Sequence, residues 1–297
     1  MKVALVFGGA SAEREVSIKT GKAVLQACKE NNYDVDALLI DKNYEEVYPT
    51  LKKADIVFNA LHGTFGEDGV LQKWLEENNI KFTGSGSFSS ALCMNKIECK
   101  KILRANGFLT PDWLKAKENI QIEKSFFPCI VKPNAQGSTF GLTFVNEFDD
   151  LNGALLKSQR FDKSTLIEKY VKGREITVGI LDDNTLPIVE IFPSHKIYDY
   201  KCKYTPGMSN YKCPAKIDSL LSKQIMDDSM KIFKLLGCKG YGRLDYILDN
   251  NNNYYFLEIN TLPGMTATSL LPIAANAQGI SFKVLVKKII DLGLNSV

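Results

Sequence analysis

The stretch "GRLDYILDNNNNYYFLEIN", residues 242–260, places four asparagines between two strand-like runs. Asparagine tolerates the positive φ that tight hairpin turns need, so Asn251 and Asn252 are expected to form a two-residue turn. Asp245 then lies opposite Glu258. Because side chains alternate between the faces of a strand, polar groups share one face and apolar groups the other. The stretch predicts an antiparallel hairpin packed on a core.

The polar face of this hairpin also brings Arg243 opposite Asn260. The apolar face is expected to carry Leu244, Tyr246 and Leu248 against Ile259, Leu257 and Tyr255. Two facing carboxylates repel each other, so the register indicates a positive group between them. Aspartate, glutamate and asparagine oxygens are typical ligands of magnesium, which often arrives bound to substrate phosphates. The alternative is a solvated face without a metal.

Composition sets the class of protein. The chain has 297 residues, of which 45% are hydrophobic and 24% charged, as expected for two or three packed globular units. A net charge of +3 without basic blocks gives no indication of nucleic acid or membrane binding. Seven cysteines without a C-x-x-C pair fit a reducing cytosol. The apolar run of "MKVALVFGGA" is too short for a signal or a membrane span, so we expect a cytoplasmic protein.

The N-terminal segment alternates strands and helices. "KVALVF" (2–7), two glycines and the amphipathic "REVSIKTGKAVLQACKENN" (14–32) predict strand, turn and helix, and "ADIVFNALHG" (54–63) with "GVLQKWLEENNI" (69–80) repeats the plan. This predicts a parallel sheet, whose ligands lie at the carboxyl ends of the strands, where "GGASAERE" (8–15) falls. That loop lacks G-x-G-x-x-G, so a dinucleotide site is not favoured.

Two further sections follow. The first contains a helix in "MNKIECKKILRANG" (94–107) and strands in "PCIVKP" (128–133) and "LTFV" (142–145), joined by a glycine-bearing loop. The second begins near Asp182 and contains the long stretch "FPSHKIYDYKCKYTPGMSNYKCP" (192–214). A connection of that length is typical of a functional lid or of disorder, and its tyrosines argue against disorder.

Short motifs leave alternatives open when the residues are taken by themselves. Lys132 and the following "NAQGSTFG" could cover phosphates or form a plain hairpin turn. Glu168 and Glu175 could meet an adenosine or be solvated edge-strand carboxylates. Glu15 could bind a substrate ammonium or be a first-turn helix acid. His62, after a strand, is more often structural than catalytic.

The turn "NTLPGMTATSLLP" (260–272) follows the hairpin directly. Gly264 offers an unhindered backbone N–H, and Ser269 could cap a helix or bind a carboxylate. A turn that needs proline and glycine for its shape explains both residues equally well. The position next to the predicted metal face favours a functional turn.

Taken together, these segments resemble the D-alanine–D-alanine ligases of the ATP-grasp superfamily over nearly the whole chain. The resemblance rests on "ALVFGGASAEREVS", "ALHGTFGEDGVLQ", "TGSG", "MNKIECKKIL", "VKPNAQGSTFGL", "IEKYVKGREITV", "YDYKCKY", "GRLDYIL" and "LEINTLPGMT", in this order. It implies an α/β ATP-grasp fold with an N-terminal parallel α/β substrate domain (1–95). A central subdomain (96–181) and a C-terminal subdomain with metal site and lid (182–297) would clasp ATP.

The resemblance also implies an activity. Such an enzyme joins two D-alanines at the expense of ATP, through an acyl phosphate, to supply the peptidoglycan of the cell wall. It would use two magnesium ions, for which manganese can substitute, and would act in the cytoplasm as a homodimer. No nucleic acid or membrane partner is expected.

Roles for individual residues follow from the resemblance alone. Glu15 would bind the first ammonium, linked by hydrogen bonds to Ser138 and Tyr204, with His62 nearby. Arg243 and the Gly264 N–H would stabilise an oxyanion, and Ser269 would receive the second carboxylate. The nucleotide would be held by Lys96, Lys132, Glu168, Lys169, Val171, Glu175 and Lys203, the last of them on the lid. The metal ligands would be Asp245, Glu258 and Asn260.

Three other functions compete with this one. Another ATP-grasp ligase could join a carboxylate to a different amine or hydroxyl, but "GGASAEREVS" and "YDYKCKY" favour the D-alanine enzymes. A non-catalytic nucleotide-binding protein would lack some of the metal or oxyanion groups, whereas all of these positions are filled. A nicotinamide dehydrogenase is the third, and it would have to bind a nicotinamide cofactor.

Overall fold

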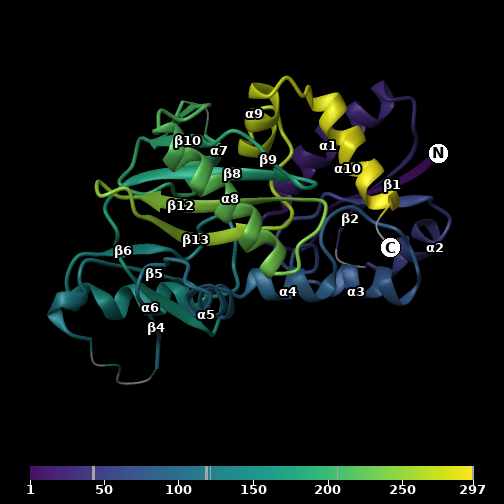
Figure 1. The fold of residues 1–297 in the computed structure, drawn as a ribbon. Helices are drawn as coiled ribbons and strands as arrows, with labels where there is room; N and C mark the ends of the chain where they lie inside the picture. The colour runs from purple at the N-terminus through teal and green to yellow at the C-terminus, as the bar shows by residue number, and fades with distance from the viewer. Residues whose placement is uncertain (42–43, 118–119, 121, 206, 296–297) are drawn as a thin grey trace.

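The chain forms three β-sheets that follow one another along the sequence (Figure 1). The computed structural model describes residues 1–41, 44–117, 120, 122–205 and 207–295. The sheets have the strand orders β2-β1-β3, β4-β7-β5-β6 and β11-β10-β8-β12-β13, with β9 paired to β8. Within the described residues, no helix is long and apolar enough to cross a membrane.

The first sheet is parallel, as the sequence predicts. β1 (Lys2–Gly8) lies between β2 (Asp34–Ile40) and β3 (Ile56–Asn59). Its alternate residues Val3 and Leu5 pack with α1 (Arg14–Glu30) and α10 (Phe282–Asn295), while Ala4 and Val6 pack with α2 (Tyr48–Leu51) and α3 (Val70–Glu77). Burial of both faces explains why β1 is apolar throughout.

The second sheet is antiparallel and carries the glycine-bearing loop. It contains β4 (Trp113–Lys115), β5 (Cys129–Pro133), β6 (Thr143–Val145) and β7 (Thr165–Lys169). α4 (Ser87–Met94) and α5 (Lys96–Ala105) precede it, and α6 (Leu151–Gln159) packs on it. Single-turn 3₁₀ helices η1 (Glu45–Val47), η2 (Lys124–Phe126) and η3 (Phe148–Asp150) lie in the connections.

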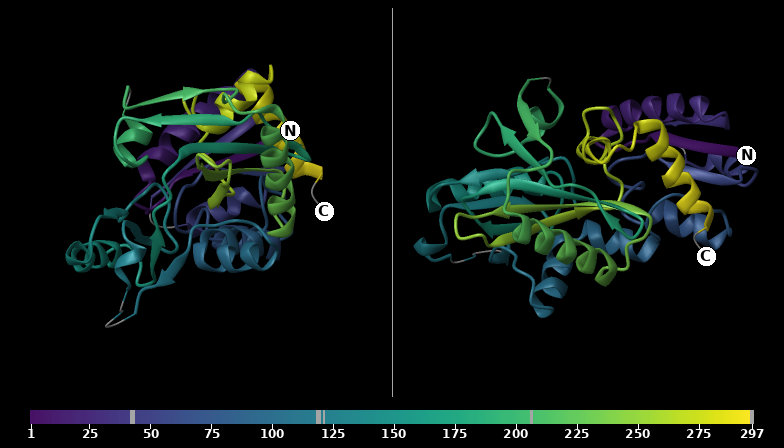
Figure 2. Two further views of the ribbon diagram at one scale, coloured as in Figure 1. Left: turned by 60° about the vertical axis from the view of Figure 1, so that its left-hand side comes forward. Right: turned by 45° about the horizontal axis from the view of Figure 1, so that its top comes forward.

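The third sheet is also antiparallel. It contains β8 (Arg174–Leu181), β9 (Asn184–Thr185), β10 (Val189–Pro193), β11 (Ser209–Lys212), β12 (Tyr241–Leu248) and β13 (Tyr254–Asn260). α8 (Ser219–Leu235) runs along one side of this sheet, and the segment with α7 (Tyr200–Tyr204) lies on the other side (Figure 2). The long connection 192–214 is therefore partly ordered into a helix and a strand.

Two segments, β8 and α10, lie with other sheets than their place in the sequence suggests. The chain passes from the second sheet to the third at 170–173, ahead of the expected limit at 181/182, because β8 pairs with β10 and β12. The C-terminal helix α10 packs against α1 on the first sheet, within a core that also includes residues of the third sheet such as Leu181 and Val189 (Figure 1). α9 (Leu270–Ala277) leads into it and contributes to the same core.

The hairpin β12–β13 has the predicted register only in the half that carries Arg243 and Asp245. Arg243 lies opposite Asn260 and Asp245 opposite Glu258, as predicted. A bulge after Asp245 then shifts the pairing, so that Phe256 and Tyr254 take the places expected for Leu257 and Tyr255. The predicted two-residue turn is wrong: the turn spans 249–253, because the Asp249 carboxylate accepts the N–H groups of Asn251 and Asn253, each at 2.8 Å.

Candidate functional site

Two adjoining cavities lie where the three units meet. One has a volume of about 360 Å³ and the other about 400 Å³, within the range that holds a small ligand. Lys96, Tyr198, Lys203 and Glu258 border both of them. A group bound in one cavity can therefore reach a group bound in the other past these four side chains.

The larger cavity lies between the second and third sheets. Ile130 from β5, Ile247 from β12 and Leu257 from β13 give it apolar walls. It is also lined by Lys132, Glu168, Lys169, Val171 and Glu175, all of which were predicted to hold a nucleotide. Apolar walls suit a planar base, and lysines suit phosphates. The bulge in the hairpin matters here, because it turns Leu257 toward this cavity and not into the core.

Lys132 and Glu168 both line this cavity and form an ion pair with each other. The Lys132 Nζ lies 2.7 Å from Glu168 Oε2, and the other carboxylate oxygen of Glu168 contacts Lys100. Burial would raise the pKa of Glu168, but the two ammonium groups outweigh it and lower that pKa. The Glu168 side chain is thus committed to two cations, and its main chain lies within the sheet, paired with β4 on one side and β5 on the other.

The sequence prediction missed Lys100, a fully buried lysine. Its Nζ donates to Thr110 Oγ1 at 2.6 Å and to the Phe256 carbonyl at 3.3 Å, and burial lowers its pKa to about 8. A signal exists in the sequence: Lys100 lies between Ile97 and Leu103, the apolar positions on the buried face of α5.

The strand end beside this cavity offers a limited set of backbone groups. The Lys169 N–H donates to the Asp112 carbonyl at 2.7 Å. Of its backbone groups, Lys169 could therefore offer only the carbonyl to a nucleobase. Glu175, at the start of β8, points into the same cavity. Burial raises the pKa of Glu175 to about 7, against the opposing influence of the Lys203 charge.

The facing carboxylates of the hairpin are neutralised by basic side chains. Arg243 binds Asp245 through two hydrogen bonds of 2.9 and 2.8 Å, and Lys96 Nζ lies 3.2 Å from Glu258. Burial opposes ionisation of Glu258, but Lys96 and then Lys203 hold its pKa well below the usual range. The positive groups inferred from the register thus include an arginine and a lysine.

The same face fits a magnesium ion by its donor set. Asp245, Glu258 and Asn260 provide only oxygen ligands, which is the preference of a hard cation. Asp245 lines the larger cavity, Asn260 the smaller, and Glu258 both. Asn260 Oδ1 also accepts the Leu262 N–H at 2.9 Å, which fixes the direction of its amide.

The smaller cavity contains a chain of hydrogen bonds between three units. Tyr204 Oη on α7 lies 2.8 Å from Ser138 Oγ in the glycine-bearing loop, and Ser138 Oγ donates to Glu13 Oε1. Glu13 is only 4% exposed, and its Oε2 has no hydrogen-bond partner within the described residues. A Cβ at Gly137 would lie 2.9 Å from that oxygen, so any larger residue there would push the Glu13 carboxylate aside.

The prediction that Glu15 occupies this place is wrong. Glu15 is exposed on the first turn of α1 and lines neither cavity. Glu13 precedes the helix, where Ser11 Oγ accepts its N–H at 3.1 Å and donates to the His62 carbonyl at 2.6 Å. The loop before α1 thus turns Glu13 toward the cavity.

Charges around Glu13 set its protonation. Burial, and then the neighbouring Glu67 carboxylate, raise the pKa of Glu13 to about 7. His62 is buried between Glu67, 3.0 Å from its Nδ1, and Thr20, 3.0 Å from its Nε2. Burial would lower the pKa of His62, but Glu67 outweighs it and raises that pKa. His62 lines the same cavity as Glu13, and its charge favours the ionised form of the Glu13 carboxylate.

Gly264 and Ser269 also line the smaller cavity. Ser269 Oγ accepts the Thr266 N–H at 3.0 Å and lies 2.8 Å from Thr266 Oγ1. A Cβ at Gly264 would lie 3.1 Å from Ser269 Oγ, so the two predicted residues are neighbours. Arg243 lines the cavity as well, and the structure therefore brings together all the predicted catalytic residues except Glu15.

Comparison with known proteins identifies relatives along the whole chain. A family profile described as "D-ala D-ala ligase C-terminus" matches residues 94–291, and one described as "D-ala D-ala ligase N-terminus" matches 2–50 and 44–85. The D-alanine–D-alanine ligase of Carboxydothermus hydrogenoformans is 42% identical, over 99% of this chain and 98% of the relative. That of Aquifex aeolicus is also 42% identical, over 98% of this chain and 100% of the relative.

Solved structures of similar proteins have the same fold. A D-alanine–D-alanine ligase from Bacillus anthracis complexed with ATP has a TM-score of 0.85 and 34% identity, covering 99% of this chain and 97% of the other. A D-Ala:D-Ser ligase from Enterococcus faecalis has a TM-score of 0.83 and 29% identity, covering 98% and 99%.

Proposed function

The chain belongs to the D-alanine–D-alanine ligase family, and we propose that its smaller cavity binds two D-alanines while its larger cavity binds ATP. The protein is an ATP-grasp ligase that joins two D-alanines at the expense of ATP, for peptidoglycan precursor synthesis. The observation that carries the assignment of the cavities is the unpartnered, buried Oε2 of Glu13, in the cavity next to the lysine-lined one.

The first D-alanine binds through its ammonium. Glu13 Oε2 is a buried acceptor aimed into the cavity, and a bound ammonium would satisfy it. Ser138 and Tyr204 hold the other carboxylate oxygen in place. With the ammonium fixed at Glu13, the carboxylate of the same substrate can point toward Lys96 and Lys203, which border both cavities.

The first chemical step forms an acyl phosphate. A carboxylate oxygen of the first D-alanine attacks the γ-phosphorus of ATP, and the bond to the β,γ-bridging oxygen breaks to release ADP. Lys96, Lys132 and Lys203 offset the negative charge that gathers on the phosphoryl oxygens. The base would lie against Ile247 and Leu257, and Glu175 would accept hydrogen bonds from the ribose.

Asp245, Glu258 and Asn260 would hold two magnesium ions, or manganese in their place, and such ions neutralise phosphate charge. Arg243 already binds Asp245 through two hydrogen bonds and keeps its guanidinium beside the substrate cavity. Arg243 and Asp245 thus hold one another in position before substrates arrive.

The second step forms the peptide bond. The amine of the second D-alanine attacks the acyl carbon, and the tetrahedral oxyanion is stabilised by Arg243 and the Gly264 N–H. The carbon–oxygen bond to phosphate then breaks, and the nitrogen loses its proton. Ser269, next to Gly264, would receive the carboxylate of the second D-alanine.

The activity is tested directly with the purified chain. Incubation with ATP, magnesium and D-alanine should release ADP and phosphate and yield the dipeptide, identified by mass. D-Serine and D-lactate offered in competition would detect a different second substrate. Release of phosphate that does not depend on D-alanine would contradict the assignment.

We further propose a cytoplasmic homodimer. All seven cysteines are free thiols, as a reducing compartment would leave them, and ATP is available there. Two large apolar side chains on neighbouring helices, Val70 on α3 and Phe88 on α4, are 52% and 78% exposed and support a subunit contact. Light scattering of the wild type and of Phe88→Ser would test the dimer, which should weaken in the variant.

A further inference from the structure

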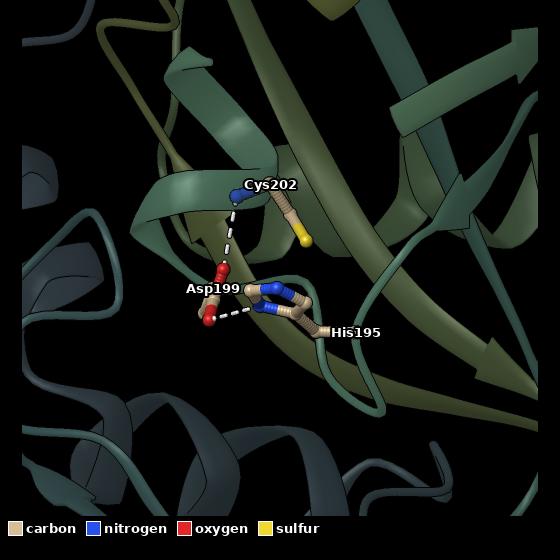
Figure 3. A group of neighbouring side chains, drawn as sticks. All are labelled: His195, Asp199 and Cys202. Carbon is tan, nitrogen blue, oxygen red and sulfur yellow. Dashed lines mark hydrogen bonds and ion pairs between the residues drawn. The ribbon is translucent and has the colours of Figure 1, made fainter. Parts of the chain in front are cut away.

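We propose that His195, Asp199 and Cys202 bind one zinc-like divalent cation, and that the bound ion restrains α7. One ligand atom from each side chain lies within 4.8 Å of the other two. Figure 3 shows the three side chains converging from the segment before α7, from its N-cap and from the helix itself. The group is separate from the hairpin face that carries Asp245 and Glu258.

The carboxylate in the middle of this group is already held in place. Asp199 Oδ1 accepts the Cys202 N–H at 2.9 Å, which caps α7, and Oδ2 lies 2.7 Å from His195 Nδ1. Two of the three ligands are thus in contact before any ion binds. A site with fixed ligands loses little side-chain entropy when a metal enters.

The thiol gives the second, independent observation. Cys202 is only 1% exposed, and its Sγ makes no hydrogen bond within the described residues. In Figure 3 this sulfur points toward the imidazole ring of His195. The His195 side chain is 40% exposed, so an ion can reach the group from solvent. A buried cysteine is often only a small apolar side chain, and the convergence on a histidine and an aspartate distinguishes this one.

The donor set selects the ion. Nitrogen, sulfur and one carboxylate oxygen suit zinc or cobalt and not magnesium, and a water would complete a tetrahedral site. With metal–ligand bonds of roughly 2.0–2.1 Å, two ligands of a tetrahedral site lie about 3.3 Å apart. His195 Nδ1 and Asp199 Oδ2 would therefore separate slightly from 2.7 Å as the ion replaces the proton between them. The imidazole proton moves to Nε2, and the thiol releases its proton to solvent.

The position of the site gives it a consequence for the proposed function. α7 carries Tyr204, bonded to Ser138, and Lys203, which borders both cavities. An ion that ties His195 to Cys202 fixes the segment leading into this helix. Lys203 and Tyr204 must move aside each time substrates enter the cavities and products leave them. A bound ion that restrains α7 should therefore slow turnover. This part rests on the ligase function proposed above.

Cobalt binding to the full chain tests the site. Titration of metal-free protein with cobalt, in excess magnesium to fill the oxygen face, should give a thiolate-to-cobalt absorption band that saturates at one ion per chain and disappears on addition of zinc. Cys202→Ala and His195→Gln should lose the band and bind zinc at least ~10-fold more weakly. Because His195 is exposed, His195→Gln should keep the fold. Cys213→Ala, which removes a partly exposed thiol outside the group, should keep the band.

Absence of the band in the wild type, or its survival in Cys202→Ala, would overturn the site. Turnover tests the restraint: zinc should slow ADP release by the wild type at the concentrations at which it binds, and His195→Gln should need at least ~10-fold more. Equal inhibition of both proteins would refute the restraint and locate the effect at the magnesium face. A protein without D-alanine-dependent turnover would contradict the ligase function and not the metal site, which the cobalt band tests by itself.

Discussion

At the scale of single residues, the site depends on which of two glutamates faces the substrate. Glu13 and Glu15 flank Arg14, and both fit a loop that ends in a helix. The sequence cannot distinguish them, because the direction of each side chain depends on where the helix begins. In the structure α1 begins at Arg14, so Glu13 precedes the helix and turns inward, whereas Glu15 lies on its first turn and points to solvent.

Glu13→Gln should stabilise the protein while it weakens substrate binding. The folded-state pKa of about 7 lies above the ordinary 4.5, so the favourable contribution of Glu13 is complete below about pH 4.5 and is lost as pH rises through 7. Glutamine removes this dependence. Above pH 7 the variant should be more stable, by up to about 3 kcal/mol, and the difference should shrink toward pH 5. Denaturant unfolding at pH 5 and pH 8 measures it.

The same substitution should raise the KM of the first D-alanine at least ~100-fold, as expected for loss of a buried charge pair. In the wild type, that KM should rise as pH falls below 7, because Glu13 becomes neutral. Glu15→Gln is the matched control and should change neither property. A Glu15→Gln variant that loses activity while Glu13→Gln keeps it would reverse the assignment.

Glu258→Gln should nearly abolish ligation and preserve the fold. The substitution keeps the size of the side chain but removes one charge from the proposed metal face and leaves Lys96 without its carboxylate partner, with only the Gln136 carbonyl to accept its hydrogen bond at 2.8 Å. We expect kcat to fall at least ~100-fold at saturating magnesium, as for loss of a principal electrostatic group. Circular dichroism and steady-state kinetics provide the measurement. Near-normal turnover would show that this face does not hold the catalytic metal.

At the scale of elements, the pattern of polar and apolar residues predicts strand pairing best where two strands are neighbours in the sequence and form a hairpin. The charge pattern of 242–260 predicts the inner register of the hairpin, because polar and apolar faces cannot be exchanged without burying charge. The outer register fails because one side chain, Asp249, organises a longer turn that a count of asparagines does not reveal. Likewise, the length of 192–214 predicts a functional connection, but α7 within it depends on the cap provided by Asp199.

Tyr204→Phe should loosen the attachment of α7 to the substrate cavity. It removes the hydrogen bond to Ser138 and keeps the ring that packs on Tyr200. One such bond contributes about 0.5–1.5 kcal/mol, so kcat/KM for D-alanine should fall roughly 2–12-fold with little change in Tm. Tyr200→Phe removes a hydroxyl from the same helix and should have little effect.

The Tyr204–Ser138 pair also predicts non-additive effects. Once Ser138→Ala has removed the partner, the further change Tyr204→Phe should have almost no effect on kcat/KM. Fully additive losses in the double variant would mean that the two hydroxyls act independently, and that Tyr204 does not attach α7 through Ser138.

At the scale of the whole molecule, the sequence predicts three units but not which sheet each strand or helix joins. Strand and helix patterns are local, so the parallel first sheet and the hairpin follow from them. Sheet membership is not local: β8 follows β7 closely in the chain but pairs with β12, which lies sixty or so residues further on. The packing of α10 on the first sheet cannot be predicted from its sequence pattern either. An amphipathic pattern shows which face of a helix is buried but not which core that face packs against.

Lys100 links two of these units, and its loss should affect both stability and nucleotide binding. From α5 it contacts Glu168 on β7 of the second sheet and the Phe256 carbonyl on β13 of the third, beneath the larger cavity. Lys100→Met fills the same space but leaves Glu168 with Lys132 alone, and breaking a buried pair typically costs about 3–5 kcal/mol. Because Lys132 remains, we expect a loss near the lower end of that range, seen as a lower urea midpoint. Lys132 would then be drawn more strongly to Glu168 and less to phosphate, so ADP should bind more weakly by calorimetry.

Lys101→Met, one residue along the same helix, removes only an exposed pair with Glu98 and should cost less than about 1 kcal/mol. Equal urea midpoints for the two variants would mean that the buried ion pair does not join the second and third units.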